Sequence, residues 1–146
     1  MKKIAFLFIT TILFTAKVFA GGDDILGIWF NEEKTGKVEI YKVDGKYYGK
    51  IIWLKEPKDA NGNEKTDIHN SDVNKRKNKV MGLIMLRGFN YDAEDNNYVD
   101  GNIYDPKNGK DYSCKMKLID KNNLDVRGYV GISLLGRTTK WTRTTK

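Results

Sequence analysis

Hydrophobic and polar residues alternate along most of the chain after residue 20, and this period of two is typical of β-strands with one buried face. Between residues 37 and 43, for example, Val38 and Ile40 alternate with lysine and glutamate side chains. Asp44-Gly45 follows, and this pair favours a tight hairpin turn because both turn positions take positive φ. The pattern predicts eight strands, at residues 26–31, 37–43, 46–54, 79–87, 97–104, 110–119, 123–130 and 137–144.

Two segments interrupt this alternation. Residues 55–78 form a long polar stretch with turn signals rich in glycine and asparagine, and loops of this length are usually functional or flexible. Residues 79–87 are almost continuously apolar. A strand of that kind needs cover on both faces, so we expect it at the centre of the sheet or beneath the long loop.

Short hairpin connections join most of the predicted strands, which gives an antiparallel meander. A meander of about eight strands most simply closes into an up-and-down β-barrel, because closure removes exposed sheet edges. A sandwich of two sheets is the alternative arrangement. We therefore expect a single all-β domain over residues 21–146.

The first twenty residues have the three parts of a secretory signal peptide. Lys2 and Lys3 form a positive head, residues 4–14 are apolar apart from two threonines, and the tripeptide 18–20 ends in Ala20. The apolar run is shorter than the roughly 20 residues that cross a bilayer. The sequence predicts cleavage near Ala20 and a mature protein in the periplasm or outside the cell.

Charge and cysteine content narrow the set of partners. The formal net charge is +7, and Lys2, Lys3 and Lys17 of the predicted signal peptide supply three of these charges. The mild basic excess that remains favours solubility and weak attraction to anionic surfaces, and we expect no nucleic-acid partner for an exported protein. Cys114 is the only cysteine, so the chain has no intramolecular disulfide, and its alternation with apolar neighbours indicates a buried structural thiol.

The two ends of the domain carry matching aromatic and basic residues. Gly27 and Trp29 lie in the first predicted strand, and Trp141 and Arg143 lie in the last. In a closed barrel these strands are neighbours, so an arginine can stack on an indole ring, which contributes about 0.5–2 kcal/mol. This pattern resembles the end motif of calycins, the group that includes lipocalins and fatty-acid-binding barrels. We interpret these four residues as structural barrel closure.

A second resemblance covers nearly the whole chain after residue 20. The motifs that carry it are Gly27-x-Trp29, Val80-Met81-Gly82-Leu83, Gly101-x-Ile103-Tyr104-Asp105-Pro106-x-x-Gly109-Lys110-x-Tyr112, Leu124-x-Val126-Arg127-Gly128-Tyr129-x-Gly131 and Gly136-Arg137-Thr138-x-x-Trp141-x-Arg143. With these motifs the sequence is similar to the bacterial exported family called "domain of unknown function 2147", and the resemblance implies an exported β-domain without an assigned activity. Between Asp67 and Arg76 the chain lacks the proline that we expect after Asn70.

Signals for catalysis are weak, and the sequence favours a protein that is not an enzyme. His69 is the only histidine, and the residues beside it are too near in sequence to complete a serine triad. One histidine and one cysteine do not make the usual zinc ligand set, so we predict no metal and no cofactor. Asp100, Asp105 and Asp111 lie on or near strands, but their spacing does not fix a pair of catalytic carboxylates.

The signals for ligand binding are stronger. Several side chains combine a large apolar area with a polar tip, as residues that line ligand pockets do. An inward Arg127 would require a carboxylate partner or an anionic ligand, and an outward one would be an ordinary solvated arginine. The apolar face of its strand should be the core face, which favours the outward position. The candidate ligand-binding residues are Trp53, Tyr104, Tyr112, Arg127 and Tyr129.

Three functional hypotheses follow, in order of preference. The first is an exported barrel that binds a small, partly apolar ligand, with an anionic group on that ligand as a further option. The second is an envelope interaction protein whose basic loop, residues 55–79, contacts an anionic membrane or a protein through Lys75, Arg76 and Lys77. The third is a hydrolase of envelope material.

Overall fold

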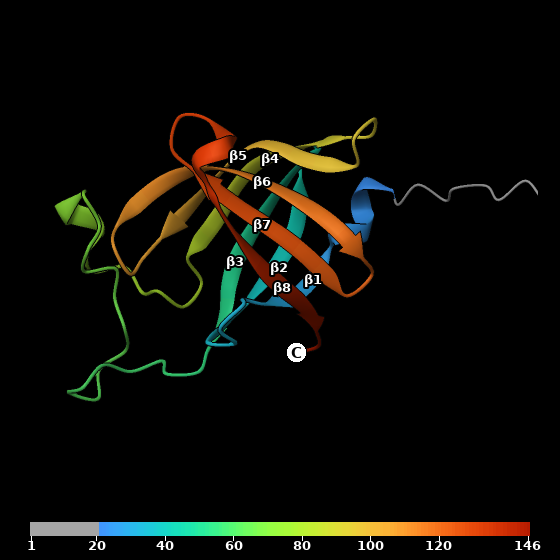
Figure 1. Ribbon diagram of the computed structural model, residues 1–146. Helices are drawn as coiled ribbons and strands as arrows, with labels where there is room; N and C mark the ends of the chain where they lie inside the picture. Colours follow the sequence, from blue (N-terminus) through green and yellow to red (C-terminus); the bar gives the residue numbers. More distant parts are fainter. Residues whose placement is uncertain (1–20) are drawn as a thin grey trace, which may run out of the picture.

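Eight antiparallel strands close into one β-barrel in the computed structural model, which describes residues 21–146 (Figure 1). Every strand pairs with the next, and β8 pairs with β1. The up-and-down barrel is thereby confirmed over the sandwich, and the predicted signal peptide lies outside the described residues. The strands are β1 (Gly27–Phe30), β2 (Gly36–Val43), β3 (Lys46–Leu54), β4 (Ile84–Asp92), β5 (Asn97–Asp105), β6 (Lys110–Asp120), β7 (Asn123–Tyr129) and β8 (Arg137–Thr144).

Helical structure in residues 21–146 is confined to three short 3₁₀ turns. They are η1 (Gly22–Ile25) before the first strand, η2 (Val73–Lys75) in the long loop, and η3 (Ser133–Leu135) between β7 and β8. Within this described part of the chain, no helix is long and apolar enough to cross a membrane.

One predicted strand was misplaced. The segment expected at 79–87 is observed as β4, which begins only at Ile84 and continues to Asp92. Residues 80–83 instead form a turn, in which the Leu83 N–H donates to the Val80 carbonyl oxygen over 3.1 Å. Val80 is buried against the core from this turn, so it is apolar without belonging to the strand ladder. A continuous apolar run has no alternation to mark where a strand begins, which explains the error.

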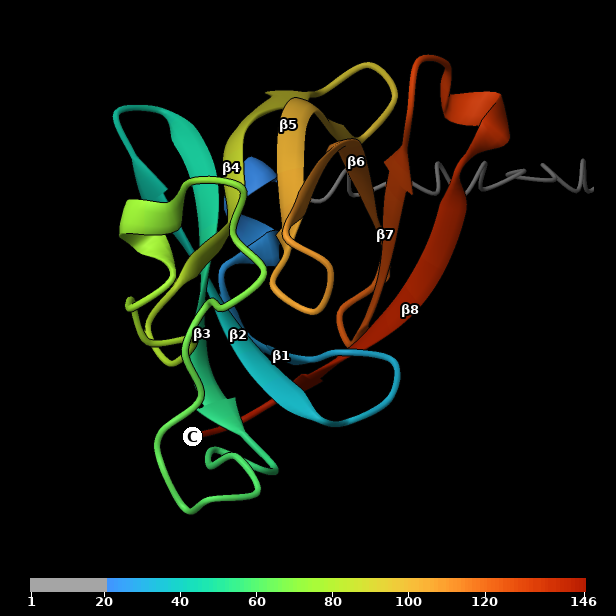
Figure 2. The ribbon, with the colours of Figure 1, turned by 90° about the vertical axis from the view of Figure 1, so that its left-hand side faces the viewer.

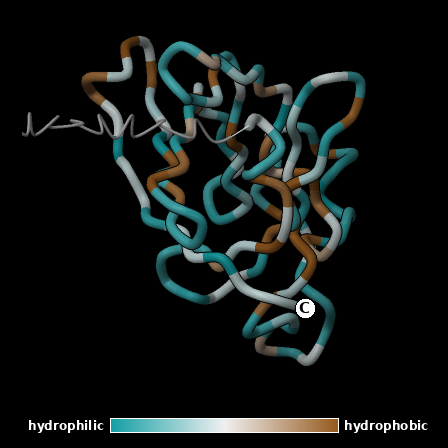
Figure 3. The backbone as a smooth tube through the Cα atoms, turned by 90° about the vertical axis from the view of Figure 1, so that its right-hand side faces the viewer, coloured by the Kyte–Doolittle hydropathy of each residue, from teal (hydrophilic) through white to brown (hydrophobic). Residues whose placement is uncertain are grey.

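The up-and-down order sends loops to the two ends of the barrel in alternation. Residues 31–35, 55–83, 106–109 and 130–136 lie at one end, which we call the open end. Residues 21–26, 44–45, 93–96 and 121–122 lie at the other, the closed end. Figure 2 views the molecule from the side of the long loop, with residues 55–83 in front of the strands, and Figure 3 views it from the opposite side.

The hydrophobic core is densest in the half of the barrel near the closed end. Tyr47 and Tyr98 meet edge to face with ring centroids 5.1 Å apart, and both are buried together with Trp29 and Phe89. Burying a side chain of this size contributes about 1.5–3 kcal/mol relative to leaving it exposed. This half of the interior is therefore filled by protein side chains.

Candidate ligand-binding cavity

A cavity of about 1000 Å³ occupies the open end of the barrel. Near the closed end the interior holds Trp29, Phe89 and Tyr98, whereas the cavity wall includes Gly128 and Thr139. An eight-stranded barrel is just wide enough to be filled by side chains or to hold one small ligand. In this barrel the half near the closed end is filled by side chains, and the half near the open end holds the cavity.

The deep wall of the cavity is mainly apolar. Val38, Ile51 and Val126 belong both to the hydrophobic core and to the cavity lining, and so does Trp141. The indole N–H of Trp141 donates to the Thr139 hydroxyl oxygen over 3.1 Å, so this polar group of the wall already has a partner. Such a wall matches the apolar part of a ligand and leaves few polar groups unsatisfied.

The rim of the cavity is charged, with both signs interspersed. Lys107 Nζ lies 2.9 Å from the Glu33 carboxylate, and its hydrogen bond lowers the pKa of Glu33. Arg137 lies 3.7 Å from Glu32. Neither sign dominates, so the rim does not by itself select an anion or a cation. The charged residues of the lining are Glu32, Glu33, Lys55, Glu56, Asp59, Lys65, Asp105, Lys107 and Arg137.

The long loop is fastened to the open end by a buried carboxylate. Asp67 is 1% exposed, and its side chain accepts hydrogen bonds from the Tyr104 hydroxyl and from the Asn70 amide, each over 2.7 Å. Burial and the hydrogen bond to Asp67 raise the pKa of Tyr104 to about 12. Nearby, a Cβ on Gly109 would overlap the His69 carbonyl oxygen, so only glycine allows the loop this close to the β5–β6 turn.

The structure separates the five predicted ligand-binding residues. Tyr104 and Tyr112 contribute to the cavity lining, whereas Trp53, Arg127 and Tyr129 do not. Trp53 is paired with Lys37 on the outer wall and meets Phe30 edge to face. Of the five residues, only Tyr104 and Tyr112 reach the cavity, so a role in ligand binding stays a prediction for these two tyrosines alone. The other three were placed there by residue type. Arg127 and Tyr129 alternate with the buried face of β7 and therefore lie outside. Trp53 is in phase with the buried Ile51, but a register shift in β3 pairs it with Lys37 on the outer wall.

Arg127 has a structural partner in place of a ligand. Its Nε donates to the Ser133 carbonyl oxygen over 2.7 Å, Nη1 donates to the Thr138 hydroxyl over 2.9 Å, and Nη2 donates to the Leu134 carbonyl oxygen over 3.2 Å. The guanidinium is therefore neither buried in the barrel nor simply solvated. It holds the β7–β8 loop, and η3 within it, against the outer wall.

The predicted contact between the chain ends is present at the closed end. The Arg143 guanidinium carbon lies 4.2 Å from the centroid of the Trp29 ring. Its nitrogens donate to the carbonyl oxygens of Leu26, Asp24 and Lys121. One side chain thus joins the N-terminal segment, the β6–β7 turn and the β1–β8 seam.

The remaining two closure residues have different positions. Gly27 has φ of +130°, and a Cβ there would lie 2.8 Å from Arg143 Nη1, so glycine is required for the arginine to pass. Trp141 lies on the same strand as Arg143 but contributes to the cavity wall. It is both a core residue and a site residue.

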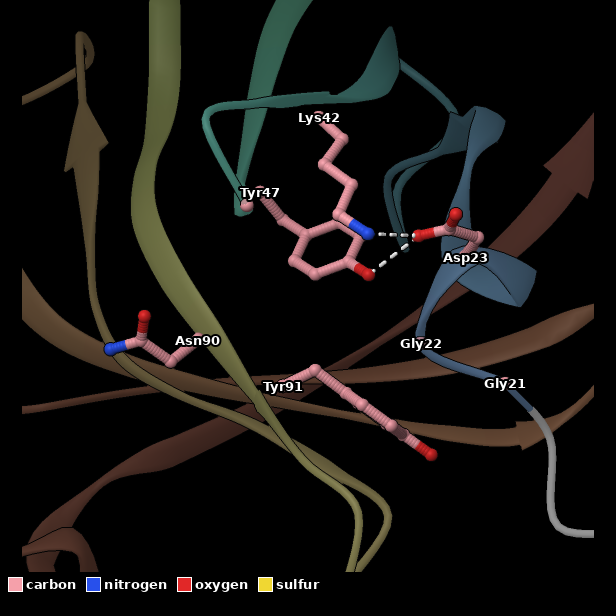
Figure 4. A pocket seen from close by; sticks show the side chains of 8 residues that line it. Gly21, Gly22, Asp23, Lys42, Tyr47, Asn90 and Tyr91 are labelled. Carbon is pink, nitrogen blue, oxygen red and sulfur yellow. Dashed lines mark hydrogen bonds and ion pairs between the residues drawn. The ribbon is translucent and has the colours of Figure 1, made fainter.

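The closed end has a smaller depression of about 440 Å³ (Figure 4). Its charged groups bind one another: Asp23 accepts hydrogen bonds from Lys42 Nζ and from the Tyr47 hydroxyl, each over 2.7 Å. The hydrogen bond from Lys42 is the main cause that lowers the pKa of Asp23. The geometry gives this depression a fastening role for η1, since its ionic groups are already satisfied.

The residues considered for catalysis are dispersed. Asp111 forms an ion pair with Arg87 on the outer wall, and the Asp105 carboxylate accepts the backbone N–H of Lys107 over 2.9 Å in a turn. Cys114 is fully buried, and burial raises its thiol pKa to about 12. Within residues 21–146, no group of three or more metal-ligating side chains comes together.

The basic cluster of the long loop is partly engaged within the loop itself. Arg76 Nε donates to the Asn70 carbonyl oxygen over 2.8 Å, and Lys75 lies 3.8 Å from the Asp72 carboxylate. Lys77 is exposed. The cluster is accessible, but its position is fixed by contacts in the loop.

Comparison with known proteins places the chain in a family. The model for "Uncharacterized protein conserved in bacteria (DUF2147)" matches residues 27–143. The chain belongs to the DUF2147 family. A solved structure of protein HP1028 from Helicobacter pylori, described as belonging to the lipocalin family, is similar with a TM-score of 0.69 and 23% identity over 83% of each chain. This likeness shows the lipocalin-type fold, and no curated protein matches the sequence.

Two site features of this DUF2147 protein were missed from the sequence. Asp67 was noted only as the start of the Asp67–Arg76 segment of the polar loop, and its buried contact with Tyr104 was not predicted. Thr139 was not considered, although it shares the inward face of β8 with Trp141, two residues away. Alternation from a known core residue would have found Thr139. No local pattern links Asp67 to Tyr104.

Proposed function

We propose that this protein binds one small, partly apolar molecule in the cavity at the open end of its barrel, and that it does so after export from the cytoplasm. The cavity of about 1000 Å³ is the observation that carries the proposal. Its volume lies at the upper end of the range of about 300–1000 Å³ that is typical of ligand sites. A barrel filled along its whole length would not have supported it.

The chemistry of the lining suggests how the ligand is oriented. The apolar part would lie against Val126 and Trp141, deep in the barrel, and a polar part would lie at the mixed-charge rim. The sequence offered Arg127 as the partner of an anionic group on the ligand. In the structure Arg127 lies outside the barrel and holds the β7–β8 loop, so it does not reach the cavity. We therefore favour a ligand without a strong net charge.

The location of this function rests on the N-terminal sequence. The positive head, apolar run and Ala20 match the pattern of a cleavable signal, and the first strand of the barrel begins at Gly27. We propose the periplasm or the extracellular space as the site of binding. The intact mass of the protein recovered from its host would test cleavage near Ala20.

Native mass spectrometry of the protein purified from its host's envelope tests binding directly. We expect a stoichiometric small molecule that is released on denaturation and can then be identified. If the protein carries no compound, titration with the apolar fluorophore N-phenylnaphthylamine replaces this step. Absence of both a bound compound and saturable fluorophore binding would contradict the proposal.

Two neighbouring positions on β5 provide a variant and its matched control. Ile103 lines the cavity, and the adjacent Asn102 is exposed on the other face of the strand. Ile103→Trp should fill part of the cavity and weaken binding about tenfold or more, whereas Asn102→Trp should leave binding unchanged. Equal binding by the two folded variants would place the ligand elsewhere.

A further inference from the structure

Exposed apolar side chains gather at the open end of the barrel. Among residues 21–146, large hydrophobic side chains are exposed mainly in the loops and strand ends around the cavity. At the closed end, Val43 and Ile119 alone are comparably exposed among the residues that the structure describes. Exposed apolar side chains that gather in one region mark interaction sites. Those at the open end are Trp53, Ile68, Val73, Met81, Ile84, Val130, Ile132, Leu134 and Leu135.

The β7–β8 loop contributes the most exposed members of this set. Leu134 is 81% exposed, Leu135 is 77% exposed, and Val130 is 72% exposed, with Ile132 between them in sequence. The loop lies at the edge of the molecule in Figures 1 and 2, and its tube shows brown stretches separated by white ones in Figure 3. Four aliphatic side chains in six residues are costly to leave in water unless another phase covers them.

Hydrogen bonds brace the loop, and three of its backbone carbonyl groups have partners. Arg127 donates to the carbonyl oxygens of Ser133 and Leu134, and the Leu135 N–H donates to the Ile132 carbonyl oxygen over 3.2 Å. Entry into an apolar phase is expensive when backbone polar groups lose water without replacement. In this loop three carbonyl groups are already hydrogen-bonded, so that cost is reduced.

Basic side chains accompany the apolar tip. No acidic residue occurs between Tyr129 and Arg137. Lys115 Nζ lies 3.5 Å from the Ser133 hydroxyl, and Arg137 follows the loop directly, 3.7 Å from Glu32. Basic residues beside an inserted apolar segment attract anionic lipid headgroups.

We propose that residues 130–136 insert into the surface of an anionic lipid bilayer and hold the open end of the barrel against it. The apolar side chains project from a loop tip, and all four are aliphatic. Protein interfaces instead depend on aromatic and arginine side chains, and the arginine here is used within the fold. Membrane docking does not require a ligand in the cavity, so its test is independent of the proposed function.

Vesicle flotation tests the proposal with the host-processed protein. The vesicles contain phosphatidylglycerol and phosphatidylethanolamine, with pure phosphatidylcholine vesicles as the uncharged comparison. We expect the wild-type protein to float with the anionic vesicles and more weakly with the uncharged ones. The double variant Leu134→Ser, Leu135→Ser should bind about tenfold or more weakly, because two leucine side chains no longer enter the bilayer.

The closed end supplies a matched control. Val43→Ser, Ile119→Ser removes two exposed aliphatic side chains from the opposite end and should leave vesicle binding unchanged. Equal loss in both double variants would overturn the proposal, and so would a wild-type protein that floats with neither kind of vesicle. Sedimentation of both proteins without lipid tests a further outcome. If the wild type is a dimer and the loop variant is a monomer, the apolar surface binds a second copy of the chain, and the membrane proposal is overturned.

Discussion

The two ends of this barrel differ in how their polar and apolar groups are satisfied. At the closed end Arg143 joins three backbone carbonyl groups and the Trp29 ring, and Asp23 joins Lys42 and Tyr47. At the open end the interior holds a cavity, and apolar side chains lie exposed around it. The closed end therefore fixes the fold, while the open end leaves surface and volume available for binding.

This difference shows how a small barrel without an intramolecular disulfide can carry a cavity. Leaving half of the interior unfilled forfeits packing that the core would otherwise contribute. The compensating contacts are concentrated at the other end, where side chains from distant parts of the sequence meet. Substitutions at the closed end should accordingly change global stability, and substitutions at the open end should change local opening or binding.

Removal of the Arg143 side chain should have the largest effect. Arg143→Ala loses a cation–π contact and three hydrogen bonds from a charged group, so we expect the free energy of unfolding to fall by about 3 kcal/mol or more. Urea denaturation measures this change. Arg143→Lys keeps the charge without the planar fork and should recover only part of the loss. A change below about 1 kcal/mol for the alanine variant would contradict the view that contacts at the closed end stabilise the whole fold.

Two glycine substitutions compare the ends directly. Gly27→Ala places a methyl group 2.8 Å from Arg143 Nη1 at φ of +130° and should cost about 1–3 kcal/mol of stability. At the open end, a Cβ on Gly36 would be 3.6 Å from its nearest neighbour, the Trp53 carbonyl oxygen. Gly36→Ala should therefore change stability by less than about 1 kcal/mol. Thermal unfolding of both variants checks the contrast, and similar losses would contradict it.

The contact that fastens the long loop should act locally. Tyr104→Phe leaves the buried Asp67 carboxylate with the Asn70 amide as its remaining side-chain partner, so the free energy of opening the loop should fall by about 1.5–3 kcal/mol. Hydrogen exchange of residues 64–80 measures this opening. Tyr112→Phe is the matched control, because that hydroxyl bonds only the exposed Asn108 side chain, over 3.0 Å. Faster exchange throughout the barrel would show that the contact is global.

Most of the fold could be predicted because its signals are local. Alternation and turn residues gave β2, β3 and β5–β8 to within one or two residues of their observed ends. The start of β4 could not be predicted. Val80 lies in the turn before the strand but is buried in the core, so its sequence pattern is the same as that of a strand residue. The Trp29–Arg143 contact was predictable because barrel closure makes the first and last strands neighbours.

The site was less predictable than the fold. The inward position of Tyr112 follows from its alternation with Cys114 and Met116, but the cavity depends on the summed size of side chains from several strands. The Tyr104–Asp67 contact joins residues 37 positions apart, through a loop without periodic sequence. Arg127 shows the same limit: its outward face was predictable, and its hydrogen bonds to the β7–β8 loop were not.

Alkaline pH should produce the smallest difference, and it should affect the open end first. The pKa of Tyr104 is raised to about 12 by burial and by the hydrogen bond to Asp67, from an ordinary value of 10.0. A raised pKa in the folded state means that the contact contributes fully below pH 10 and is lost as the pH rises through about 12. Burial raises the pKa of Tyr98 further, so the closed end should persist longer. Tyrosinate absorbance of wild type, Tyr104→Phe and Tyr98→Phe would assign the two steps. A Tyr104 hydroxyl that titrates near 10 would show that the long loop does not cover it in solution.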